Sequence, residues 1–213
     1  MGTILAAEGT SAVGAKKDSP ALQRWVDANI KIRVPQGRHK PRSGDKTMAE
    51  STQSAVDPKR ELLRHALATV AYRGGKTLRG APPAFGDFKM DDVGRTPAQI
   101  LAHMGDLMDW ALSIAQGKQT WNNSAPLAWE NEVQRFHAAL KAFDDFLASK
   151  EALHAEPEAL FQGPIADALT HIGQLAMLRR ISGHRMKSEN YYRAEIVAGR
   201  VGGEQAAPKR EFD

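Results

Sequence analysis

One short stretch carries residue types that could bind a metal ion. Asp167 and His171 are four positions apart in the segment GPIADALTHIGQ, which begins at Gly163. On a helix this spacing places both side chains on one face, with Cβ atoms about 5–6 Å apart. The surrounding residues are apolar enough to favour burial, where a carboxylate needs a cation or strong donors. A carboxylate and an imidazole so placed can share one divalent ion.

A third ligand is available from a second predicted helix. His103 follows the segment Thr96-Pro97-Ala98-Gln99, which fits a capping box with proline at the first helical position. Two imidazoles and one carboxylate on one face of an ion leave other positions open, which suits Fe(II) and, with small changes, Mn, Ni or Zn. The pattern D-x-x-x-H is also frequent by chance, so the alternative is that these histidines are ordinary hydrogen-bonded residues.

Two further polar residues lie one turn from these candidate ligands. Asp106 follows His103 by three positions, and Gln174 follows His171 by three. We expect Asp106 to be another ligand or to orient a ligand from the second coordination shell. Gln174 could bond a metal-bound water or a substrate.

Four segments with apolar faces predict the helices that position these residues. They run from Asp57-Pro58 to Gly74-Gly75, from Thr96 to Gly117, from about Pro126 to Ser149, and from Gly163-Pro164 to Gly183. Residues 74–95 are expected to form a long loop, and the residues after Gly183 an irregular tail. The sequence shows no convincing strand pattern and no internal repeat. It therefore predicts an all-α fold, a four-helix bundle in which sites are built in the core from facing helices.

The charge distribution divides the chain into two expected parts. Nine of the 29 basic and four of the 25 acidic residues lie in residues 1–47, which leaves 20 basic and 21 acidic residues in the remainder. We expect residues 1–47 to be a flexible basic extension and residues 48–213 to be the helical domain. A basic arm can bind phosphate backbones. We nevertheless favour a solvated tail over a nucleic-acid partner, because aromatic residues are sparse in it and no nucleic-acid motif follows.

Composition excludes several kinds of site. The chain has no cysteine, so any metal site must use histidine and carboxylates, and disulfides are excluded. No apolar run is long enough to span a membrane, and the first residues lack the pattern of a secretory signal. We therefore expect a cytoplasmic protein without a membrane partner.

Two motifs resemble a known family. The segments RTPAQILAHMGDLMDW, around His103, and GPIADALTHIGQLAMLRRISG, around His171, resemble the DinB/YfiT-like superfamily, and the resemblance covers roughly residues 55–200. It implies a four-helix bundle, often a dimer. It also implies a metal held by one histidine of the second helix and an H-x-x-x-H pair of a later helix. Characterised members of this superfamily include thiol-dependent S-transferases and isomerases.

Carried over residue by residue, His103 matches the lone histidine and His171 the second histidine of the pair. The first histidine of the pair falls at Asp167, which departs from the family but is itself a competent ligand. The resemblance implies a metal-dependent enzyme of the S-transferase or hydrolase type, with a divalent metal, a low-molecular-weight thiol, a small-molecule substrate and a homodimeric assembly. The alternative is a non-catalytic helical dimer that binds a metal or a small ligand.

Overall fold

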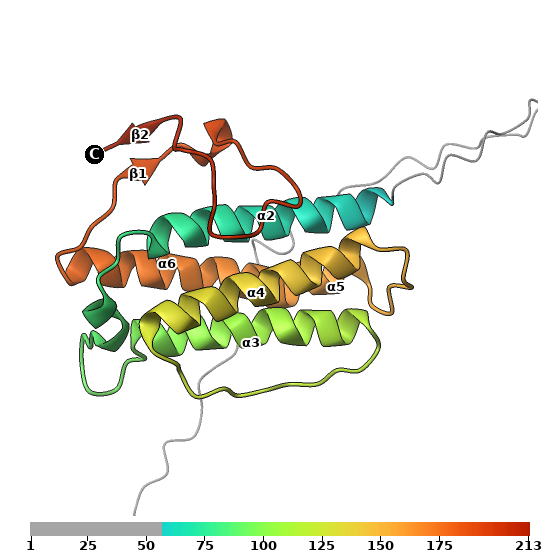
Figure 1. Cartoon of the computed structure of the whole chain (residues 1–213), viewed down its shortest axis with the longest axis horizontal. Helices are drawn as coiled ribbons and strands as arrows, with labels where there is room; N and C mark the ends of the chain where they lie inside the picture. The colour runs from blue at the N-terminus through green and yellow to red at the C-terminus, as the bar shows by residue number, and fades with distance from the viewer. Residues whose placement is uncertain (1–56) are drawn as a thin grey trace, which may run out of the picture. The chain divides into compact units, whose positions relative to one another are not determined.

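The computed structural model describes residues 57–213, and this part of the chain is mostly helical, as predicted (Figure 1). The long helices are α2 (Pro58–Leu78), α3 (Pro97–Ala115), α4 (Trp129–Ala148) and α6 (Ala166–Ile181). The short helical elements are η1 (Pro83–Asp87), α5 (Pro157–Leu160), η2 (Phe161–Ile165) and η3 (Tyr191–Arg193). The predicted extension over residues 1–47 and its boundary at residue 48 lie outside the described residues. Within residues 57–213, no helix is long and apolar enough to cross a membrane.

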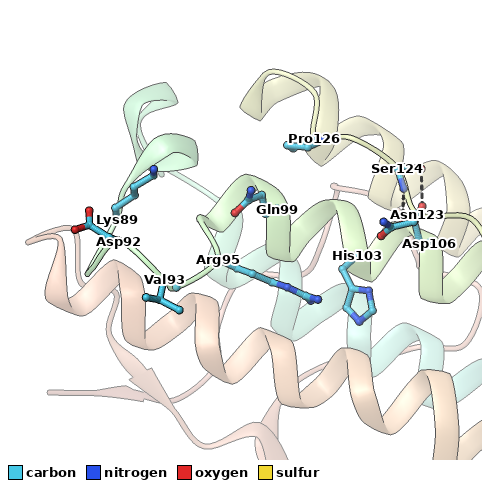
Figure 2. A pocket seen from close by; sticks show the side chains of 11 residues that line it. Lys89, Asp92, Val93, Arg95, Gln99, His103, Asp106, Asn123, Ser124 and Pro126 are labelled. Atoms are coloured by element: carbon cyan, nitrogen blue, oxygen red, sulfur yellow. Dashed lines mark hydrogen bonds between the residues drawn. The ribbon is translucent and has the colours of Figure 1, made fainter. Parts of the chain in front are cut away.

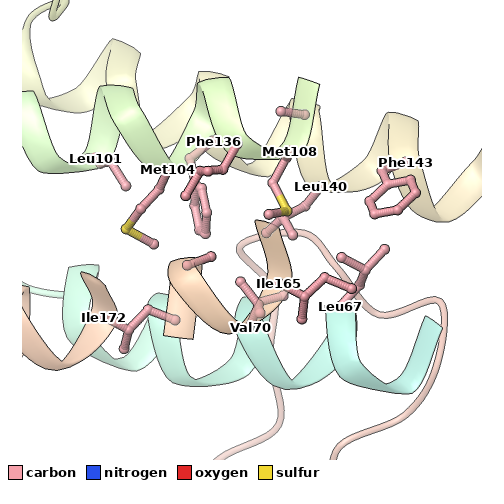
Figure 3. Packing of buried hydrophobic residues seen from close by; sticks show 14 of the residues in the cluster. Leu67, Val70, Leu101, Met104, Met108, Phe136, Leu140, Phe143, Ile165 and Ile172 are labelled. Atoms are coloured by element: carbon pink, nitrogen blue, oxygen red, sulfur yellow. The ribbon is translucent and has the colours of Figure 1, made fainter. Parts of the chain in front are cut away.

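Each long helix packs against two others. α3 contacts α4 and α6, and α2 also contacts α4 and α6 (Figure 1). The space between them is filled by buried side chains from all four helices, and Figure 3 shows this packing. Fully buried examples are Leu67, Leu101, Met104, Phe136 and Leu175. Burying one such side chain stabilises the fold by about 1.5–3 kcal/mol, so this packing fixes α3 against α6.

The predicted start of α3 is confirmed. The Gln99 N–H donates to Thr96 Oγ1 at 3.2 Å, and the Thr96 N–H donates to Gln99 Oε1 at 2.9 Å. This reciprocal pair satisfies two of the free N–H groups at the helix N-terminus and contributes about 1 kcal/mol. It fixes where α3 begins, and hence how far along the helix His103 lies.

The expected end of the first helix at Gly74-Gly75 is wrong, because α2 continues to Leu78. A Cβ added at Gly74 would lie 3.2 Å from Cε1 of Phe136, so this glycine lets α2 approach α4 closely. The expected loop over residues 74–95 is correspondingly shorter, and it contains η1. Phe85 in η1 is buried and packs edge-on against Trp129, with ring centroids 5.2 Å apart. The aromatic contact holds this loop on the core.

The helix that carries Asp167 begins earlier than predicted. The chain is helical from Pro157, and Pro164 lies inside the turn η2 rather than at the first helical position. η2 is a π-helical turn, whose wider spacing accommodates a proline that lacks the N–H for a regular i→i−4 bond. The predicted end near Gly183 is confirmed, since α6 stops at Ile181 and Gly183 has φ 83°.

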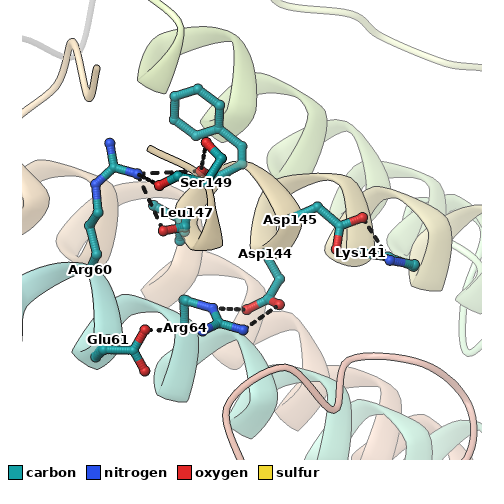
Figure 4. Close-up of polar contacts among 9 residues, drawn as sticks. Arg60, Glu61, Arg64, Lys141, Asp144, Asp145, Leu147 and Ser149 are labelled. Carbon is teal, nitrogen blue, oxygen red and sulfur yellow. Dashed lines mark hydrogen bonds and ion pairs between the residues drawn. The ribbon is translucent and has the colours of Figure 1, made fainter. Parts of the chain in front are cut away.

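Arginine side chains fix two of these helices at their ends (Figure 4). Arg64 of α2 bonds both carboxylate oxygens of Asp144 of α4, at 3.0 and 3.2 Å. Arg60 donates to the carbonyls of Leu147 and Ser149, at 3.3 and 3.1 Å. Those carbonyls lie at the C-terminal end of α4, where a cation is favourable. The contacts set the position of α2 along α4.

The C-terminal tail packs over α2 (Figure 1). Its two short strands, β1 (Ser188–Glu189) and β2 (Glu211–Phe212), pair antiparallel, although the sequence shows no strand pattern. Glu189 is buried and accepts from Tyr72 at 2.7 Å and from Lys76 at 2.9 Å. A tail expected to be irregular is thus tied to α2 by a buried ion pair.

Candidate metal site

The three predicted ligands come together between α3 and α6. Nε2 of His103 lies 3.7 Å from Oδ2 of Asp167, and Nε2 of His171 lies 3.4 Å from Oδ1 of the same carboxylate. The two imidazole rings are perpendicular, with centroids 4.9 Å apart. One ligand atom from each residue lies within 4.8 Å of the other two, so the group could hold a metal ion. This brings residues 64 positions apart in the sequence into one cluster.

The ligand atoms would need to move only slightly closer together to bind one metal ion. Ligand atoms about 2.1 Å from one ion lie roughly 3.0–3.4 Å from each other. The separation of 3.4 Å between His171 and Asp167 is at this limit, and the separation of 3.7 Å between His103 and Asp167 is longer. The Asp167 side chain is 46 % exposed and has room to turn, whereas the His103 and His171 side chains are 21 % and 12 % exposed. The histidines are held by their surroundings, and the carboxylate faces solvent, where further ligands could bind.

Gln174 orients His171. Its Oε1 lies 2.8 Å from Nδ1 of His171. An amide oxygen only accepts, so Nδ1 donates to it, and Nε2 is the ring nitrogen that faces Asp167. Histidines that bind metals are commonly oriented by such a bond to the second ring nitrogen. The sequence suggested that Gln174 could bond a metal-bound water or a substrate. In the structure its side chain contacts the His171 ring.

His103 lies against an aromatic side chain that the sequence analysis did not single out. The Trp121 ring meets the His103 ring edge-on at 5.6 Å, and Trp110 meets Trp121 at 5.7 Å. Burial lowers the pKa of His103, and the neighbouring His171 and Arg95 lower this pKa further. Its imidazole is therefore neutral near pH 7, the form that binds a metal. No local signal marks Trp121, because it lies in a loop and meets His103 only through the fold.

Asp106 has different partners from those that the sequence suggested. Its carboxylate accepts from the Ser124 N–H at 2.9 Å and from Ser124 Oγ at 2.7 Å, and it also pairs with Arg135 of α4. Asp106 is buried and faces the loop between α3 and α4, not the ligand group. This network holds the loop that carries Trp121 against α3.

A cavity of about 430 Å³ opens beside His103 (Figure 2). It lies along the N-terminal half of α3 and the loop before it. Its lining residues are Lys89, Asp92, Val93, Gly94, Arg95, Gln99, His103, Asp106, Asn123, Ser124 and Pro126. His103 therefore belongs both to the ligand group and to the wall of a cavity large enough for a small molecule.

No family model, curated protein or solved structure matches this chain. The two sequence motifs around His103 and His171 are therefore what the resemblance to the DinB-like superfamily rests on.

Proposed function

We propose that this protein is a metal-dependent enzyme of the DinB-like type that acts on a small molecule. In this proposal the four long helices form a four-helix bundle, and His103, Asp167 and His171 hold one divalent ion. The observation that carries it is the convergence of these three side chains from α3 and α6, with Gln174 orienting one of them. Zn, Ni, Mn and Fe all accept a set of two imidazoles and one carboxylate.

The chain's own residues suit such a site. His103 and His171 present imidazole nitrogens from two long helices, and Asp167 supplies a carboxylate. All three ligands come from one side, which leaves the solvent side for a substrate or water. A divalent ion held there would supply Lewis acidity and lower the pKa of a bound water or a low-molecular-weight thiol. Water would favour hydrolysis, and a thiol would favour S-transfer.

The first test is metal binding by the purified protein. We expect about one divalent ion per chain, measured by elemental analysis and by calorimetric titration. His103→Ala and His171→Ala should each raise the metal Kd by about 100-fold, since each removes one of three ligands. His65→Ala is the matched control, because His65 is exposed on α2 and should leave the Kd unchanged. A wild-type protein that binds no ion at micromolar concentration would disprove the proposal.

The second test separates an enzyme from a binding protein. The metal-loaded protein is assayed for thiol-dependent turnover of small electrophiles and for hydrolysis of small esters and amides. Turnover that His171→Ala abolishes supports the enzyme. Stoichiometric metal without turnover supports the alternative, a non-catalytic helical dimer that binds a metal or a small ligand. Sedimentation equilibrium tests the proposed dimer directly.

A further inference from the structure

The cavity beside His103 is lined by cationic side chains that have no role in the proposed metal site. Lys89 and Arg95 both line it, and within residues 57–213 neither forms an ion pair. Figure 2 shows Arg95 lying along α3 with its guanidinium directed toward His103. A planar guanidinium with free N–H groups is suited to bind an oxyanion in a bidentate manner.

The acidic residues around this cavity offset much of the positive charge of Lys89 and Arg95. Asp106 lines it too, and its partner Arg135 of α4 also pairs with Asp109 and Glu132, so the charge of Asp106 is only partly balanced. Asp91 precedes the lining residue Asp92; it accepts the backbone N–H groups of Val93 and Gly94 and keeps its negative charge. Asp92 lines the cavity and offsets the charge of one of the two cations. A single negative charge on a ligand matches this balance better than the double charge of a phosphate monoester.

We infer that this cavity binds the carboxylate of the small molecule on which the metal site acts, with Arg95 as the main anchor. The inference rests on the proposed function for the role of the metal, but carboxylate binding can be measured without it. His103 is on the cavity wall, so a ligand whose carboxylate meets Arg95 can extend toward the ion. The side-chain amide of Asn123 lies on the same wall and offers an additional donor. The substrate class is therefore a small organic acid with a second, reactive group.

The test uses probes that differ in one charge. Zinc-loaded protein is titrated with two series of compounds that both bind zinc through a hydroxamate. In the first series a carboxylate lies about two to four methylene groups from the hydroxamate, and in the second an amide replaces this carboxylate. We expect the acid to bind about tenfold more tightly than the amide at low salt, as for a charge-assisted bidentate bond. Arg95→Met should abolish this preference, and Arg95→Lys should retain part of it. Arg180→Met, an exposed cation on α6, is the control and should retain all of it.

Separate outcomes identify which proposal fails. If zinc binds and the acid and amide bind equally, or if the preference survives Arg95→Met, the carboxylate site is wrong and the metal site stands. If zinc does not bind, the proposed function fails, and the cavity is then tested with butyrate on the metal-free protein through the Arg95 Nε–H NMR signal. A shift that saturates supports the carboxylate site, and no shift overturns it. Tighter binding of a phosphate-ended hydroxamate than of the carboxylate would overturn the charge argument.

Discussion

Nδ1 of His171 lies 2.8 Å from Oε1 of Gln174, one helical turn further along α6. The bond holds the ring of His171 so that its other nitrogen, Nε2, faces Asp167. Gln174 itself is on the exposed face of α6, so its place in the site does not come from burial. The effect of removing it should therefore appear in metal affinity more than in stability.

Gln174→Leu should raise the metal Kd of the wild-type site by about tenfold, at the low end of what such orienting residues contribute. The free energy of unfolding of the metal-free protein should change by less than about 0.5 kcal/mol, as at other exposed positions. Calorimetric titration with zinc and urea denaturation measure the two effects. Gln134→Leu, at an exposed position of α4, is the matched control. Equal effects of the two variants on the Kd would rule out an orienting role.

Asp167 should set which ion the site prefers. Carboxylate ligands suit harder ions such as Mn(II), whereas imidazole suits Ni and Zn. Asp167→His should therefore increase the affinity ratio of Ni to Mn, by about tenfold or more. Competition titrations with both ions on the variant and the wild type measure this ratio. Asp145→His, an exposed aspartate on α4, controls for adding a surface histidine. An unchanged ratio in Asp167→His would show that residue 167 does not bind the ion.

The two adjacent glycines of α2 should respond in opposite ways to substitution. A Cβ at Gly75 meets only the flexible Gln205 side chain, at 3.6 Å. Gly75→Ala should thus stabilise the protein by about 0.5–1 kcal/mol through helix propensity. At Gly74 a Cβ would already lie only 3.2 Å from the Phe136 ring, so the larger side chain in Gly74→Leu should destabilise by about 1–3 kcal/mol through overpacking. Chemical denaturation measures both, and a stabilising Gly74→Leu would contradict the close approach of α2 and α4.

His137 should make stability depend on pH. Burial lowers its pKa, although its contact with the Val201 carbonyl, at 3.3 Å from Nδ1, acts in the opposite direction. The folded protein then binds fewer protons than the unfolded chain, in which histidine titrates near pH 6.5 (about the ordinary value). The stabilisation is therefore complete above that pH and is lost as the pH falls through the lower pKa of the folded state.

His137→Asn keeps a donor for Val201 but removes the titrating ring. The free energy of unfolding, measured in urea between about pH 8 and 5, should fall less with acidification in this variant than in the wild type. His65→Asn is the control, because His65 is exposed on α2. Parallel pH profiles for His137→Asn and the wild type would show that His137 does not contribute. His103 has a lowered pKa as well and remains in every protein compared, so some pH dependence should persist.

The sequence by itself determined the mostly helical content, the start of α3 and the three candidate ligands. Those signals are local: Thr96 and Gln99 satisfy each other's N–H groups, and Asp167 and His171 are four residues apart on one helix. The sequence predicted helix boundaries wrongly where a residue type occurs both at helix ends and inside helices. Glycine and proline commonly mark helix ends. Gly74 nevertheless lies inside α2, where it packs against Phe136, and Pro164 lies inside the π-helical turn η2.

Only the tertiary structure decided which polar side chains meet. His103 joins Asp167 and His171 because the buried side chains between α3 and α6 fix one helix against the other. Asp106, only three residues from His103, is instead turned toward Arg135 and Ser124. Spacing along a helix tells which residues share a face, but the neighbouring element that each face meets is chosen by the burial of apolar surface over the whole domain. The sequence could therefore name His103, Asp167 and His171 as candidate ligands, whereas their convergence, the contact with Trp121 and the cationic cavity depend on the tertiary structure.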